Sequence, residues 1–109
     1  MIPLSDLKIP EKIKQDIETI VRGLKFISNV NKIILFGSYA TGKYQPDSDI
    51  DIAVALNEMP DISQRRNYKQ AVETDREIDL LFCSREQLAS NEFVYRRINE
   101  QGVLLYEQL

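Results

Sequence analysis

The 109-residue chain contains no histidine and a single cysteine, Cys83. Without histidine, the protein has no Ser-His-Asp or Cys-His catalytic mechanism and no metal site that needs an imidazole ligand. With one cysteine, it has neither a disulfide within the chain nor a thiolate zinc site. Any metal ion must therefore be held by oxygen ligands, which favours Mg²⁺, Mn²⁺ or Ca²⁺ over zinc.

Long apolar runs and a surplus of basic residues are also missing. The longest apolar runs, such as Ile52–Leu56, are far shorter than the ~20 residues that cross a bilayer. The first residues show neither the basic start nor the apolar stretch of a signal peptide. The 14 Lys and Arg residues against 17 Asp and Glu give a net charge of −3, which lacks the basic footprint of proteins that grip a nucleic-acid backbone. We therefore expect a cytoplasmic protein that binds no membrane and forms no stable complex with nucleic acid.

What is present suits a single domain over residues 1–109. The chain is shorter than the ~150 residues that serve as a prior for one domain, and 43% of its residues are hydrophobic. A chain of this size buries roughly two-thirds of its unfolded surface. We expect it to fold around its own core without disulfides.

Helical and strand patterns alternate along the chain. Apolar residues at helical spacing predict a helix over about 10–27, and further helical segments are predicted over about 38–42, over 61–74, from the Ser84-x-x-Gln87 capping box, and from a cap at Ser90 to a stop at Gly102. Short apolar or alternating runs predict strands over 32–36, 49–56, 78–83 and 103–106. This order predicts an α/β or α+β fold in which helices pack on a small mixed sheet.

Three aspartates lie on the predicted strands. The alternation in 49–56 places Asp49 and Asp51 on one face, with Cα atoms about 6.6 Å apart. Two such carboxylates can reach a pair of cations ~3.5–4 Å apart, as in two-metal phosphoryl-transfer sites. In the strand 78–83, Asp79 lies on the face opposite Ile78, Leu80 and Phe82. If the two strands are neighbours, Asp79 lies opposite the pair.

A second element is the corner Phe36-Gly37-Ser38, where a buried strand is predicted to turn into a helix start. Exposed backbone N–H groups make such a corner an anion site. Gly37 lets a phosphate approach the backbone, and Ser38 can donate its hydroxyl. A phosphate-binding corner next to metal-binding carboxylates is what a nucleoside triphosphate with Mg²⁺ requires.

The spacing of these elements resembles a known family. Gly37-Ser38, ten intervening residues and Asp49-Ile50-Asp51 resemble the Gly-Ser-x10-Asp-x-Asp signature of the nucleotidyltransferase superfamily that includes DNA polymerase beta. Over essentially the whole chain, the sequence looks like the minimal MNT-domain members of bacteria and archaea, which are usually paired with a HEPN-domain protein. The matching strings are Gly37–Gly42, Pro46–Asp51, Glu77–Leu80 and Gly102–Glu107. Thr41 departs from the pattern, because many members carry arginine there.

The resemblance implies a role for each of these residues. Asp49 and Asp51 would bind the catalytic Mg²⁺, with Mn²⁺ as a substitute, and Asp79 would complete one metal site and help to activate the attacking hydroxyl. Gly37 and Ser38 would hold the terminal phosphates. The implied reaction moves a nucleoside monophosphate, AMP from ATP, to a hydroxyl of a partner protein. The implied partner is a HEPN-type toxin, modified on tyrosine and silenced by this chain as antitoxin.

Several other interpretations compete with this one. Asp49 and Asp51 could form a solvated strand face, and Gly37 and Ser38 could be only a strand end and a helix cap. The residues Asp47, Asp49, Asp51 and Glu58 fit positions 1, 3, 5 and 12 of a calcium loop, but Ile52 stands where that loop needs glycine. The chain could also bind a nucleotide and mask its partner by contact alone. A fourth alternative, modification of a small molecule, is disfavoured because related antibiotic-modifying enzymes carry an added domain.

Overall fold

The structure, a computed structural model, describes residues 4–72 and 74–108. In this part of the chain, one sheet has the strand order β3–β2–β1–β4. Its strands are β1 (Val30–Phe36), β2 (Ile50–Leu56), β3 (Ile78–Ser84) and β4 (Val103–Glu107). The strand β1 is antiparallel to β2 and β4, whereas β2 and β3 are parallel. The predicted mixed sheet is confirmed.

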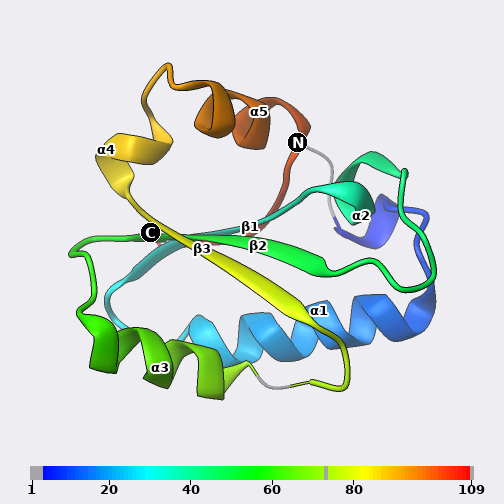
Figure 1. Ribbon diagram of the computed structural model, residues 1–109, viewed down its shortest axis with the longest axis horizontal. Coiled ribbons are helices and arrows are strands. Elements are labelled where there is room, and N and C mark those ends of the chain that lie inside the picture. The colour runs from blue at the N-terminus through cyan, green and yellow to red at the C-terminus, as the bar shows by residue number, and fades with distance from the viewer. Residues whose placement is uncertain (1–3, 73, 109) are drawn as a thin grey trace.

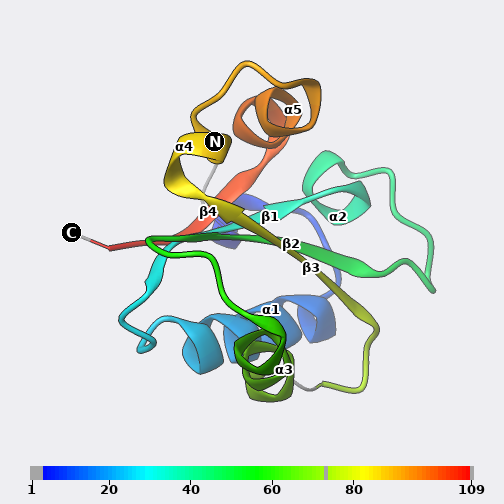
Figure 2. The ribbon, with the colours of Figure 1, turned by 60° about the vertical axis from the view of Figure 1, so that its left-hand side comes forward.

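Helices cover both faces of this sheet (Figures 1 and 2). After the short 3₁₀ turn Leu4–Asp6, the helices are α1 (Glu11–Leu24), α2 (Ser38–Thr41), α3 (Ile62–Ala71), α4 (Arg85–Leu88) and α5 (Phe93–Gln101). Helices α1 and α3 lie on one face, and α4 and α5 on the other. The short α2 follows the end of β1. In the described part of the chain, no helix has both the length and the apolar character needed to cross a bilayer.

The alternation within β2 explains this two-sided packing. Ile50, Ile52, Val54 and Leu56 are buried in the larger cluster, together with Ile13, Ile17, Ile20 and Leu24 of α1. The residues between them face the other way, so Ala53 and Ala55 pack in a second cluster with Leu88, Tyr95 and Ile98 of α4 and α5. The apolar stripe of α1 has the predicted helical spacing, because these residues fall on one side of a helix with 3.6 residues per turn.

Several predicted boundaries are wrong by a few residues. Helix α1 ends at Leu24 rather than at 27, and Val30, predicted as part of a break, begins β1. The predicted start of the second strand at Asp49 is one residue early, because β2 begins at Ile50. The predicted last turn of the helix 61–74 includes Glu73, which lies outside the described residues, and α3 ends at Ala71.

One predicted helix cap is also wrong, and α3 buries a residue for which the sequence gives no signal. The capping box of Ser84 and Gln87 is confirmed, but α5 begins after Glu92, because the Ser90 hydroxyl instead donates to the Gln87 carbonyl oxygen at 2.7 Å. In α3, Ile62 is 75% exposed, whereas Tyr68 is 6% exposed. The hydroxyl of Tyr68 accepts a hydrogen bond from the Asn29 side chain. Tyr68 is therefore a core residue and is not available to a partner.

Candidate functional site

The pairing of β2 and β3 brings two of the predicted aspartates together. Asp51 and Asp79 are direct partners in the parallel register. Side chains of paired residues on neighbouring strands point to the same face of a sheet, which here is the face covered by α4 and α5. Asp49 lies one residue before β2. The sequence predicted that Asp79 lies opposite Asp49 and Asp51 if the two strands are neighbours, and β2 and β3 are neighbours.

Burial and charge both act on Asp51. Burial raises the pKa of this carboxyl above its usual 3.8, and the negative charges of Asp79 and then Asp49 raise it further. Asp51 is half-buried, while Asp49 and Asp79 are exposed. The surroundings of Asp51 thus disfavour its anionic form, unless a cation lies beside it.

The donor chemistry of this face fits a hard divalent cation, because Mg²⁺ and Mn²⁺ prefer carboxylate oxygens. The charges of Asp79 and Asp49, which raise the pKa of Asp51, also favour a cation at this place. Among residues 4–72 and 74–108, however, no group of three or more His, Cys, Asp or Glu side chains is arranged to hold a metal ion. The backbone brings the carboxylates to one face, but their oxygen atoms do not converge as ligands.

Gly37 joins this face to the phosphate-binding corner predicted from the sequence. It has φ 74° and ψ −153°, a conformation that residues with a side chain rarely adopt. A Cβ atom at this position would collide with Oδ2 of Asp51 and lie 2.9 Å from its Cγ. The backbone at Gly37 therefore lies directly against the Asp51 carboxylate, and only glycine fits there.

Ser38 is the first residue of α2 rather than its cap, since Gly37 occupies the cap position. The alternative in which Ser38 serves only as a cap is therefore wrong. The Thr41 hydroxyl lies within hydrogen-bonding distance of the carbonyl oxygens of Gly37 and Ser38, at 3.3 and 3.4 Å, so it is held by the backbone of its own turn. The calcium-loop alternative also fails, because Ile52 belongs to β2.

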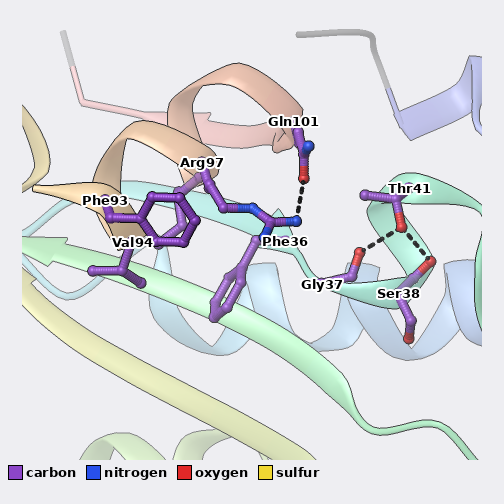
Figure 3. A pocket seen from close by; sticks show the side chains of 9 residues that line it. Phe36, Gly37, Ser38, Thr41, Phe93, Val94, Arg97 and Gln101 are labelled. Atoms are coloured by element: carbon purple, nitrogen blue, oxygen red, sulfur yellow. Dashed lines mark hydrogen bonds between the residues drawn. The ribbon is translucent and has the colours of Figure 1, made fainter.

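A pocket of about 430 Å³ adjoins the corner (Figure 3). It lies between the end of β1, α2 and α5, and its lining residues are Phe36, Gly37, Ser38, Thr41, Phe93, Val94, Arg97, Ile98 and Gln101. Phe36 is the register partner of Asp51 across β1 and β2. Sequence reasoning missed the contribution of α5, because no motif spacing links residues so far apart along the chain.

The pKa of Asp51 leads to a stability prediction for the protein in EDTA. The pKa of Asp51 is higher in the folded state than in the unfolded state. Above pH 3.8 the folded state therefore binds more protons, and the free energy of unfolding falls as the pH rises. Asp51→Asn removes this cost, so its melting temperature should exceed that of the wild type at pH 7. The gain should shrink toward zero below pH 3.8. Melting curves at both pH values test this, with the exposed Asp47→Asn as control; an equal gain at both would contradict it.

Comparisons with known proteins identify similar sequences and similar structures. The model of a family described as Polymerase beta, Nucleotidyltransferase matches residues 15–108. A protein of Methanocaldococcus jannaschii named "Putative protein adenylyltransferase" is 35% identical over 60 residues, which make up 55% of this chain and 56% of that protein. The matched segment thus spans about half the length of this relative.

Two similar solved structures are complexes. A toxin-antitoxin with AMP-PNP superposes with a TM-score of 0.60 at 31% identity, over 86% of this chain and 73% of that one. A complex from Shewanella oneidensis, of a tri-AMPylated HEPN toxin with an MNT antitoxin, has a TM-score of 0.60 at 27% identity, over 87% and 72% of the two chains.

Proposed function

Because this chain belongs to the polymerase beta nucleotidyltransferase family, we propose that it transfers a nucleoside monophosphate, AMP from ATP, to a hydroxyl group of a partner protein. The observation that carries the proposal is the contact between the Gly37 backbone and Asp51, which is itself paired with Asp79. A triphosphate bound along Gly37 and Ser38 lies beside the carboxylates that its reaction needs. In this proposal, Asp49, Asp51 and Asp79 hold Mg²⁺ or Mn²⁺.

The proposed step breaks a phosphoanhydride bond and forms a phosphoester bond. The acceptor oxygen bonds to the α-phosphorus, the bond between that phosphorus and the bridging oxygen breaks, and pyrophosphate leaves. A bound divalent cation would neutralise the phosphate charge and stabilise the attacking and leaving oxygens. Asp79 is exposed on β3, where an incoming hydroxyl can reach it and pass it a proton. Gly37 and Ser38 orient the terminal phosphates, so catalysis rests on position and charge rather than on a covalent intermediate.

The partner supplies the acceptor in this proposal. The chain has a net charge of −3, which suits neither a groove for nucleic acid nor non-specific phosphate binding. One of the solved complexes similar to this chain pairs an MNT antitoxin with a tri-AMPylated HEPN toxin, and another is a toxin-antitoxin with AMP-PNP. We therefore infer a HEPN-type toxin as the partner, with this chain as its antitoxin.

A second candidate function is regulation by contact alone. The observation in its favour is that the described carboxylates do not form a ready metal-binding group. In that case the chain would bind a nucleotide and mask its partner without transferring anything.

Intact mass spectrometry separates the two functions. A candidate HEPN-type partner protein is co-expressed with the wild type, with Asp51→Asn, or with the exposed control Asp47→Asn. We expect the partner to gain the mass of at least one nucleoside monophosphate with the wild type and with Asp47→Asn, but not with Asp51→Asn. A stable complex without any gain in mass would contradict transfer and favour the contact mechanism.

A further inference from the structure

The pocket beside the Gly37–Ser38 corner contains a charged group that the proposed reaction has not yet used. Among its described lining residues, Arg97 is the one that carries a charge. It comes from α5, and its side chain extends toward Gly37 and Ser38 (Figure 3). The remaining walls include Phe36, Phe93, Val94 and Ile98, so the pocket combines apolar surface with one cation.

Arg97 is held in place without being neutralised. Its Nη2 donates a hydrogen bond to Oε1 of Gln101 at 3.4 Å, and its guanidinium lies 5.6 Å from the ring centroid of Phe93. The two ion pairs found in the described part of the chain are Lys12–Asp16 and Lys32–Glu107. A guanidinium that is oriented by neutral partners keeps its donors and its full charge for an anion.

The pocket continues directly from the carboxylate face. Phe36 pairs with Asp51 in the sheet, and the Gly37 backbone lies against the Asp51 carboxylate. A ligand that begins at Asp51 and passes over Gly37 and Ser38 therefore extends toward Arg97. Such a ligand needs a reacting group at one end and negative charge at the other. A nucleoside triphosphate, with its α-phosphate at Asp51, meets both requirements.

We propose that Arg97 binds the β- and γ-phosphates of the nucleoside triphosphate, a role that rests on the transferase function proposed above. The planar guanidinium can contact two phosphate oxygens at once. During transfer, negative charge develops on the departing pyrophosphate, so Arg97 also stabilises the leaving group. Thr41 does not replace it, because its hydroxyl is engaged by backbone carbonyl oxygens.

The test compares nucleotides that differ only in the part that Arg97 contacts. Titration calorimetry measures the binding of AMP-PNP and of AMP, both with Mg²⁺, to the wild type and to three variants. Arg97→Gln removes the charge, and Arg97→Lys retains the charge but cannot form the bidentate contact of a guanidinium. Arg96→Gln is the matched control. Arg96 is its exposed neighbour on α5 and does not line the pocket.

We expect Arg97→Gln to weaken AMP-PNP binding about 10- to 100-fold, the size of a lost hydrogen bond to a charged group. AMP binding should change less than about 3-fold by the same reasoning, because AMP carries no phosphate that reaches Arg97. Arg97→Lys should lie between the wild type and Arg97→Gln. Arg96→Gln should bind both nucleotides as the wild type does, and unchanged melting temperatures would exclude a general loss of structure.

The remaining outcomes separate this inference from the proposed function. If Arg97→Gln binds AMP-PNP normally while the wild type still modifies its partner, the role of Arg97 is overturned and the transferase function stands. Equal weakening of AMP and AMP-PNP would also overturn it, since the effect would not follow the terminal phosphates. If the wild type neither binds AMP-PNP nor transfers nucleotide, the proposed function fails and this inference fails with it.

Discussion

Replacing Asp49 and Asp51 together by asparagine is expected to lower the rate of nucleotidyl transfer by about 10³-fold or more. The estimate follows from the several kcal/mol of charge stabilisation that a metal site gives a phosphoryl-transfer transition state. The double variant loses two of the three carboxylates on this face, and Asp79 alone cannot complete a site. The measurement is the initial rate of label transfer from α-³²P-ATP to the partner protein with saturating Mg²⁺.

The control for this variant must remove the same charge from the same region. Asp47→Asn with Asp75→Asn does so, because both residues are exposed and precede β2 and β3 in the chain without belonging to either strand. We expect its rate to stay within about 3-fold of the wild type, because isolated surface charges contribute little. Magnesium-dependent binding of ATP should disappear only in the Asp49 and Asp51 variant. Equal ATP affinity in that variant and in the wild type would contradict a metal site at these aspartates.

Replacing Gly37 by alanine is expected to destabilise the fold strongly. The backbone conformation at Gly37 costs a residue with a Cβ atom about 1–3 kcal/mol. The new methyl group would also collide with the Asp51 carboxylate, and overpacking adds about 1–3 kcal/mol. We therefore expect a total loss of about 2–6 kcal/mol, measured by urea unfolding, together with loss of transfer.

Gly42 provides the matched control. It also has a positive φ, 81°, but a Cβ atom there would meet nothing within 4 Å. Gly42→Ala should therefore cost only about 1–2 kcal/mol, the strain of the left-handed conformation. Gly37→Ala should be less damaging when Asp51 is alanine, because the collision with the carboxylate is then gone. If the losses of unfolding free energy from Gly37→Ala and Asp51→Ala simply add in the double variant, the contact between Gly37 and Asp51 does not carry the effect.

The sequence predicted those parts of the molecule in which local pattern and tertiary packing agree. The strict alternation from Asp49 to Leu56 has one physical solution, a strand with one apolar face and one face that carries carboxylates, and β2 has that form. The pairing of Asp51 with Asp79 followed once β2 and β3 were neighbours. Gly37 was identified for its freedom to approach a phosphate, but its contact with Asp51 depends on how β1 and β2 pair.

Other features depend on contacts between distant segments and left no local signal. Helix α3 is polar on most sides, so the sequence did not indicate that Tyr68, rather than Ile62, is buried. The buried hydroxyl group of Tyr68 needs a hydrogen-bond partner, which Asn29, on the loop before β1, provides. Arg97 enters the pocket only because α5 packs on the same face of the sheet as Asp51. The spacing between Gly37 and Arg97 carries no information about that approach.

Asp79 lies on β3, at the edge of the sheet, whereas Asp51 lies on the central strand β2. The sheet hydrogen bonds of β3 run to β2 alone, while β1 and β2 are each paired on both sides. Edge strands open locally at a lower free energy than the central strands beside them. Such an opening would withdraw Asp79 from Asp51. Because Leu80 and Phe82 pack against the larger cluster and Cys83 is buried in the second, it would also uncover part of the core. We therefore expect the pairing of the two carboxylates to be lost at a lower free energy than the fold as a whole.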